Sequence, residues 1–227
     1  MRRLLTGRLR GWRSLVAAVG LSTIAGCSTL QISLPPITEA PTNNRLTGKI
    51  VWHDLLTNDI EGSRAFYSGL FGWEFEEVPL TLGFGKSSRY LLIRHKGRLI
   101  GGMFDTRDAD EQVNSSQWVS IMSVADLDAA VAAVTPAGGA VLTPPTDLAQ
   151  RGRIAVVRDA TGALFAMLQT ANGDPLDDPP RPGEFMWDEL WTDDIDTAVV
   201  FYQQLAPFES VRQPVASGVY QALAIAG

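Results

Sequence analysis

The sequence predicts an α+β fold built from two tandem βαβββ units, followed by a third unit that is incomplete. Two observations favour this fold. A strand, a helix and three further strands are expected in that order twice between residues 48 and 170, and the beginning of the first unit recurs after residue 184. Alternating apolar residues mark the strands, and apolar residues at helical spacing mark the helices.

An export signal is expected before this fold. Five arginines and no acidic residue lie in the first thirteen positions, and the apolar stretch that follows, Leu15 to Ile24, is shorter than the about 20 residues that span a bilayer. Residues 24–27 resemble the bacterial lipobox. We therefore expect a signal peptide over 1–26 and lipidation of Cys27, although an ordinary signal peptide with an incidental cysteine is the alternative.

Loss of the leader makes the mature chain strongly acidic. The sequence has 19 basic and 25 acidic residues, and the leader removes five basic and no acidic ones, which leaves a net charge of −11. Such a surface repels phosphate backbones, so nucleic acid is not expected as a partner. Residues 27–47 are rich in Pro, Thr, Asn and Ser and predict a flexible tether between lipid and domain.

The domain itself is expected over 48–170, with one unit over 48–105 and the other over 117–170. Asp59 and Asp126 each have the position of a helix N-cap, and Gly162 marks a tight hairpin turn. The expected strands are 49–57, 73–78, 88–95, 98–104, 117–124, 140–143, 153–158 and 164–169, and the expected helices are 60–70 and 127–134.

A linker rich in Pro and Asp, 171–183, leads into the third unit, 184–227. Eight residues between Trp52 and Leu70 recur between Trp187 and Leu205 at a constant offset of 135. The copy ends within its third expected strand, which would leave an open sheet edge. We interpret it either as the truncated start of a second domain or as a tail that borrows a partner through this edge.

A set of aromatic, acidic and glycine residues in these units carries a family pattern: Trp52, Asp54, Leu55, Thr57, Asp59, Phe66, Tyr67, Leu70, Phe71, Gly72, Trp73, Phe75, Asp159, Thr161, Gly162, Ala163 and Phe165. The pattern resembles the glyoxalase, bleomycin-resistance and extradiol-dioxygenase superfamily, also called vicinal oxygen chelate, and within it the glyoxalase-like tandem-domain members. The resemblance covers 48–170 well and 184–227 in part. It implies that the paired units curl into a cup-shaped mixed sheet whose concave face holds the ligand.

The resemblance also implies a divalent metal in active enzymes, bound by His or Glu from the first and fourth strands of each unit. Those positions fall on Trp52, on Gly101 or Gly102, near Val119 and on Ala166. None of these side chains can bind such a cation. We therefore expect neither a metal nor another cofactor.

The two histidines, His53 and His95, form with Asp54 the alternative set of metal ligands. Because side chains alternate along a strand, His53 is expected to point toward the helices when Trp52 points into the cup. The ordinary interpretation is a partly buried or interfacial His53 and a solvated His95 before a turn.

When Trp52 points into the cup, Asp54, two residues further along the strand, lies on the same concave face. Trp187 and Glu189 have the equivalent places in the repeat. An aromatic plate beside a carboxylate suits a flat or cationic ligand, so these four residues are the candidate ligand-binding residues. The alternative leaves Trp52 in the core and pairs Asp54 with a backbone donor or an arginine.

A second place for a ligand is the loop in which Arg151 and Arg153 flank Gly152. These arginines could meet an anionic substrate, although a solvated turn is the ordinary interpretation. No nucleophile elbow, phosphate loop or zinc-binding helix occurs in the sequence, and no catalytic residue is identified.

The expected function is that of a metal-free lipoprotein that binds a small molecule without transforming it. Its partners would be that ligand and the membrane, which it would meet through Cys27 at the cell envelope, on the periplasmic face of the outer membrane if the host is Gram-negative. One alternative is a metal-dependent lyase, isomerase or dioxygenase. Another is a non-catalytic scaffold that self-associates through the incomplete C-terminal unit.

Overall fold

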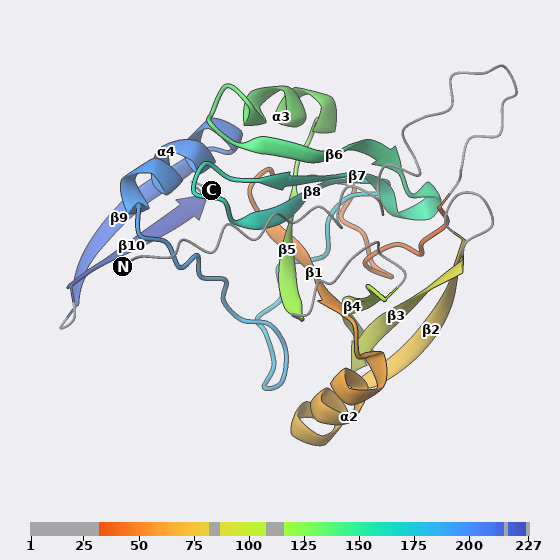
Figure 1. Ribbon diagram of the computed structural model, residues 1–227. Coiled ribbons are helices and arrows are strands. Elements are labelled where there is room, and N and C mark those ends of the chain that lie inside the picture. The colour runs from red at the N-terminus through yellow and green to blue at the C-terminus, as the bar shows by residue number, and fades with distance from the viewer. Residues whose placement is uncertain (1–31, 82–86, 108–115, 216–217, 226–227) are drawn as a thin grey trace, which may run out of the picture.

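The computed structural model of this chain describes residues 32–81, 87–107, 116–215 and 218–225, so the export signal and Cys27 lie outside the described residues. Eight strands form one mixed sheet in the order β2-β3-β4-β1-β5-β8-β7-β6, and two further strands, β9 and β10, pair separately (Figure 1). The predicted α+β class and the two βαβββ units are confirmed. Among the described residues, no helix has the length and apolar character needed to cross a bilayer.

The first unit consists of β1 (Ile50–Thr57), α2 (Ile60–Phe71), β2 (Glu74–Thr81), β3 (Ser87–His95) and β4 (Arg98–Asp105). The second consists of β5 (Gln117–Ser123), α3 (Leu127–Val134), β6 (Ala140–Asp147), the short 3-10 turn η2 (Ala149–Arg151), β7 (Gly152–Arg158) and β8 (Leu164–Thr170). The C-terminal part contains α4 (Ile195–Leu205), β9 (Phe208–Val215) and β10 (Gly218–Ile225). The first strands of the two units, β1 and β5, pair antiparallel and join the halves into one sheet.

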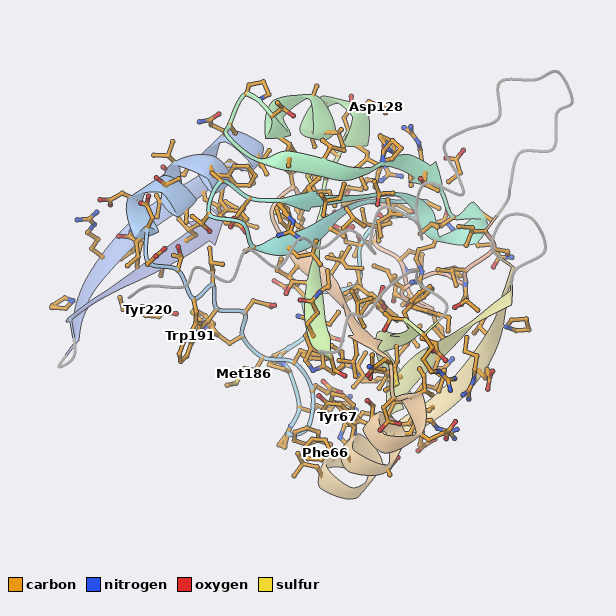
Figure 2. All side chains as sticks on the ribbon, viewed as in Figure 1. Phe66, Tyr67, Asp128, Met186, Trp191 and Tyr220 are labelled. Carbon is orange, nitrogen blue, oxygen red and sulfur yellow. The ribbon has the colours of Figure 1, made fainter. Side chains whose placement is uncertain are left out.

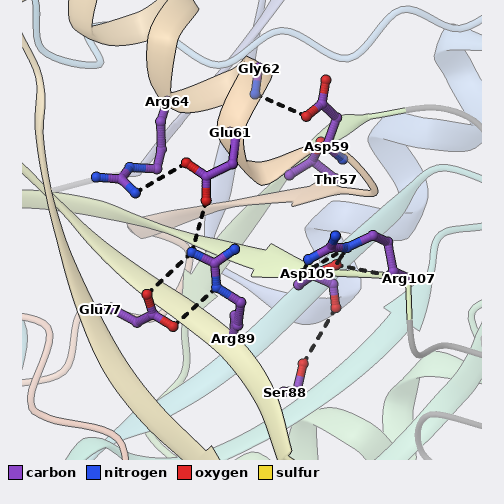
Figure 3. Close-up of polar contacts among 10 residues, drawn as sticks. All are labelled: Thr57, Asp59, Glu61, Gly62, Arg64, Glu77, Ser88, Arg89, Asp105 and Arg107. Carbon is purple, nitrogen blue, oxygen red and sulfur yellow. Dashed lines mark hydrogen bonds and ion pairs between the residues drawn. The ribbon is translucent and has the colours of Figure 1, made fainter.

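The helix starts follow the predicted caps. The Asp59 carboxylate accepts a hydrogen bond from the backbone amide of Gly62 at 2.9 Å (Figure 3), and Asp126 and Asp194 cap α3 and α4 in the same way. Near the first of these caps, Arg89 of β3 donates to Glu77 of β2 and to Glu61 of α2, as Figure 3 also shows. This exposed ion-pair group fastens the helix over the edge of its own sheet.

The third unit departs from the expectation in its first strand. Residues 185–192 have no regular secondary structure, whereas α4, β9 and β10 form where the repeat predicted a helix and two strands. A strand needs a neighbour to pair with, and the equivalent β1 pairs with β4 and β5 of its own domain. The described part of the third unit offers neither neighbour, so the copied sequence remains extended coil.

The helix α4 packs on the second unit rather than on a sheet of its own. Phe201 is fully buried in one cluster with Val134 of α3 and Phe165 and Met167 of β8. In the first unit, by contrast, Phe66 of α2 is 59% exposed, and Figure 2 labels it on that helix. Equivalent residues of the repeat therefore have opposite environments.

The concave face of the sheet, here called the cup, holds a segment of the chain itself. This segment, Ile32–Pro41, is here called the strap, and Figure 1 shows it in red to orange running between the two halves of the sheet. Leu34 and Ile37 are buried in the cup, in a cluster with Trp52, Leu92 and Leu168. Residues 32–47 were expected to be a flexible tether; instead, their apolar side chains fill the concave face.

The segment after β8 is also fixed to the domain. Asp174, which is buried, accepts hydrogen bonds from Ser123, from Thr170 and from the backbone amide of Leu46. A bridge between Pro41 and Pro175 continues this contact. The beginning of the expected linker 171–183 therefore holds the C-terminal end of the strap against the sheet.

The repeat provides a matched pair of substitutions that measures the docking of α4. Phe201→Ala should lower the free energy of unfolding by about 3–5 kcal/mol, because it removes a fully buried ring and leaves a cavity. Its counterpart Phe66→Ala should change it by less than about 1 kcal/mol. Urea unfolding of both variants checks the prediction, and equal losses would contradict this packing of α4.

Candidate functional site

The floor of the cup carries a buried polar cluster, here called the Trp–Asp–Tyr–Arg cluster, made of Trp52, Asp54, Tyr90 and Arg151. The carboxylate of Asp54 accepts hydrogen bonds from the Trp52 indole at 2.8 Å and from the Tyr90 hydroxyl at 2.7 Å. Arg151 donates from Nη1 to the Tyr90 hydroxyl at 2.8 Å, and its guanidinium carbon lies 4.9 Å from the centre of the Trp52 ring and 5.2 Å from that of Tyr90. The cluster thus combines one carboxylate, one guanidinium and two aromatic rings.

Sequence reasoning placed Arg151 in a solvated turn, and this is wrong, because only 2% of the residue is exposed. The turn η2 aims it inward through unusual backbone angles, with φ of +50° at Ala149 and +119° at Gly152. A side chain at Gly152 would overlap the carbonyl oxygen of Gln169 on the next strand, so glycine is required there. In the sequence, the glycine between Arg151 and Arg153 was the one signal that this loop is not an ordinary exposed turn.

Tyr90 links Asp54 to Arg151, and sequence reasoning missed this residue. Burial raises the pKa of the Tyr90 phenol well above its ordinary value, although the nearby guanidinium of Arg151 offsets part of the rise. The hydroxyl therefore stays protonated at neutral pH, so it can donate to Asp54 while it accepts from Arg151. Its strand, β3, lies two places from β1 in the sheet, a distance that no local sequence pattern reveals.

Asp54 was interpreted as part of a site for a flat or cationic ligand. The structure places Trp52 and Asp54 on one face, as the strand alternation predicted, but Arg151 already covers the ring of Trp52. The carboxylate is also occupied by two donors from the protein. A cationic ligand would meet the guanidinium over Trp52 and protein donors at Asp54, so the cluster disfavours it.

The positions at which the family resemblance implied metal ligands can be tested against this geometry. Gly102 lies opposite Asp54 in the β1–β4 ladder, and a Cβ added to it would overlap the Tyr90 hydroxyl and the Asp54 carboxylate. The remaining positions carry the side chains of Trp52, Val119 and Ala166, which offer no ligand atoms for a hard cation. With a guanidinium beside them, these residues do not fit a divalent metal.

The alternative metal-ligand set is not brought together. His53 lies on the opposite face from Asp54, stacked on Phe185 at a centroid distance of 4.0 Å, and its Nε2 is 2.9 Å from the Asp188 carboxylate. Partial burial favours the neutral form of Asp188, but hydrogen bonds from His53 and Ser120 and the charge of His53 outweigh it and hold the pKa of Asp188 below its ordinary range.

His95 was expected to be solvated, and this is also wrong. The residue is buried beneath the segment before the third unit, where its Nε2 lies 3.1 Å from the carbonyl oxygen of Pro182. Within the described part of the chain, no group of three or more His, Cys, Asp or Glu residues is arranged to hold a metal ion.

Trp187 and Glu189, the remaining candidate residues, lie outside the cup. Both are exposed on the coil that leads to α4, close to the labelled Met186 and Trp191 of Figure 2. The Trp187 indole donates to the Tyr220 hydroxyl at 2.9 Å, which repeats the contact between Trp52 and Tyr90. Glu189 accepts instead from the Trp191 indole. Among the described residues no arginine lies over Trp187, and the copied cluster is exposed.

Two cavities flank the strap. One has a volume of about 460 Å³ and lies among the strap, β1 and the coil after β8, with Ile37, Trp52 and Leu99 in its wall. The other has a volume of about 470 Å³ and is lined by Pro35, Leu92 and Leu99 among others. Each falls in the size range of small-molecule sites. Both cavities therefore border the strap, the first along residues 37–40 and the second along residues 35–41.

Comparison with known proteins gives a consistent family. The family model described as Glyoxalase/Bleomycin resistance protein/Dioxygenase superfamily matches residues 49–167. The chain is 29% identical over 167 residues to the "Putative glyoxylase CFP32" of Mycobacterium bovis, a match that covers 74% of this chain and 63% of the relative. It is 32% identical over 187 residues to the anthracycline biosynthesis protein DauV of Streptomyces sp. strain C5, which covers 76% of this chain and 66% of the relative.

Solved structures with a similar arrangement include two enzymes. A Mn(II)-bound glyoxalase from Novosphingobium aromaticivorans is 16% identical, with a TM-score of 0.47, and the match covers 73% of this chain and 55% of that one. A Streptomyces coelicolor methylmalonyl-CoA epimerase is 18% identical, with a TM-score of 0.44, and the match covers 57% of this chain and 99% of that one. The chain spans less than two thirds of the length of the M. bovis relative.

The absence of a side chain at residue 102 should be necessary for the Trp–Asp–Tyr–Arg cluster. Gly102→Ala should lower the free energy of unfolding by about 1–3 kcal/mol, because the added methyl overlaps the Tyr90 hydroxyl and the Asp54 carboxylate. Gly69→Ala, on α2 with open space around it, should be neutral or stabilising by up to about 1 kcal/mol. Thermal unfolding compares the two, and an unchanged Gly102→Ala variant would mean that the cluster is not packed as described.

Proposed function

The chain belongs to the glyoxalase/bleomycin resistance protein/dioxygenase superfamily, and on that premise we propose that it binds a small molecule in its cup without a divalent metal. The observation that carries the proposal is the guanidinium of Arg151, which lies over Trp52 at 4.9 Å on the face where the family resemblance implies a metal. A fixed positive charge there repels a divalent cation and takes over its electrostatic role toward a ligand.

The cavities beside the strap support a binding function. Both border the strap, and the first is lined by Ile37, one of the two apolar strap side chains that fill the cup. A segment bordered by empty space loses fewer contacts when it moves than one packed on all sides. A small apolar molecule can therefore enter beside the strap or take its place.

The names of the relatives are compatible with chemistry on a small organic molecule. One is named as a glyoxylase and another as a protein of anthracycline biosynthesis. A metal-dependent enzyme of the same superfamily is the competing function, and His53, Asp54 and His95 would be its ligands. The positions of these residues on different faces argue against it. Self-association through the C-terminal unit stays a prediction.

Cell-envelope anchoring is the second part of the proposal. The resemblance of residues 24–27 to a lipobox supports lipidation of Cys27, five residues before the strap. The lipid would then be joined to the segment that fills the cup. The acidic mature chain would gain little from anionic lipid and would depend on its acyl chains for attachment.

Metal independence and binding are tested on one preparation. Calorimetric titration of the EDTA-treated protein with Zn²⁺ and Mn²⁺ should show no stoichiometric binding, because the described residues of the cup offer no ligand set. Prodan, a neutral aromatic probe, should bind at one site per chain, with or without EDTA. A stoichiometric divalent ion together with EDTA-sensitive turnover of a glutathione hemithioacetal or a catechol would replace this proposal by the enzyme.

The site of probe binding is tested by filling the cavities. Leu99→Trp should weaken prodan binding about tenfold or more, because Leu99 lines both cavities. Leu70→Trp adds the same ring on the exposed face of α2 and should leave binding unchanged. Equal effects of the two variants would place the probe elsewhere.

Anchoring is tested by Cys27→Ser, expressed in a bacterial host with the leader intact. Incorporation of labelled palmitate should fall to background, and the protein should move from the membrane fraction to the soluble fraction, because two or more acyl chains are needed for stable attachment. Ser28→Ala is the matched control. Palmitate labelling that survives Cys27→Ser would exclude Cys27 as the lipidated residue.

A further inference from the structure

The guanidinium of Arg151 is charged, buried and incompletely paired. No described carboxylate forms an ion pair with it, and it reaches Asp54 only through the Tyr90 hydroxyl. Exposed arginines of the same sheet are better matched, since Arg89 pairs with Glu77 and Arg153 with Asp128. A buried charge without a counter-ion is costly, so the position calls for an anion that the described residues do not supply.

One edge of this guanidinium defines what that anion must look like. Nε and Nη2 lie side by side on the same edge, and Nε donates to the carbonyl oxygen of Pro35 in the strap at 3.0 Å. Nη2 is buried and has no acceptor among the described residues. A single carbonyl oxygen satisfies one of the two donors, whereas the two oxygens of a carboxylate satisfy both in parallel.

The neighbouring acid limits the charge of the ligand. Asp54 is connected to Arg151 through one hydroxyl, and its carboxylate is already fixed by Trp52 and Tyr90. A ligand with a single negative charge balances the guanidinium. A phosphate carries nearly two negative charges, and the second would lie close to the Asp54 carboxylate, which repels it.

The strap indicates that the rest of such a ligand, apart from its carboxylate, should be apolar. On either side of the Pro35 carbonyl, Leu34 and Ile37 occupy the apolar cluster of the cup. The strap therefore combines one oxygen acceptor at Arg151 with an apolar body, and it does so less completely than a free carboxylic acid would.

We propose that the cup binds an apolar monocarboxylate through the Nε–Nη2 edge of Arg151, and that the strap occupies this place until such a ligand displaces it. The inference rests on the proposed function, because it names the ligand class of the same cup. Binding then requires an open strap, so the apparent affinity is the intrinsic affinity reduced by the open fraction.

The test compares 3-phenylpropanoate with its neutral counterpart 3-phenylpropan-1-ol by calorimetry. In a Leu34→Ser/Ile37→Ser variant, which weakens the strap, the acid should bind about tenfold or more tighter than the alcohol, and also about tenfold or more tighter than it binds to the unmodified protein. Adding Arg151→Lys should lower the affinity for the acid to that for the alcohol, since an ammonium lacks the two parallel N–H donors of the guanidinium. Adding Arg153→Lys, at the exposed pair with Asp128, should leave the preference unchanged.

The outcomes separate the two proposals. Equal binding of acid and alcohol, or a preference that survives Arg151→Lys, overturns the carboxylate site and leaves a neutral-ligand cup standing. Binding of neither compound nor of prodan to the folded strap variant overturns both. If Arg151→Lys does not fold, ¹⁵N-arginine NMR of the strap variant replaces it: the acid, and not the alcohol, should shift one buried Nε–H signal, and the absence of a shift refutes the site.

Discussion

A single buried guanidinium organises the concave face of this protein. Arg151 reaches from the turn before β7 to the hydroxyl of Tyr90 on β3, and so it joins the two halves of the eight-stranded sheet across the floor of the cup. Trp52 and Asp54 complete the cluster from β1, the strand at the centre. Removing one member would leave the others buried and unsatisfied, so the cluster acts as a unit.

The strap depends on this cluster for its position. The carbonyl oxygen of Pro35 accepts from Arg151, and the apolar residues on both sides of it cover the aromatic rings from solvent. Its other end lies against the segment after β8 through the bridge between Pro41 and Pro175. The chain thus covers its own concave face with a segment whose composition resembles a linker, because burial of Leu34 and Ile37 stabilises it there.

The internal repeat separates local from tertiary causes. Asp59 and Asp194 cap their helices with the same geometry, because a cap needs only the next turn of the chain. Phe66 is 59% exposed while its copy Phe201 is fully buried, because burial depends on what lies opposite. For the same reason Trp187 repeats the bond of Trp52 to a tyrosine and yet remains exposed, without an arginine above it.

The amino-acid sequence by itself determined the element order of the two complete units, the caps, the hairpin turn at Gly162 and the strand phase that separates Trp52 from His53. Each of these follows from periodicity or from contacts a few residues long. Only the tertiary structure decided that the expected tether fills the cup and that Arg151 lies inside it. Both facts arise from contacts between segments more than a hundred residues apart, such as Pro35 with Arg151, and local patterns carry no information about such pairs.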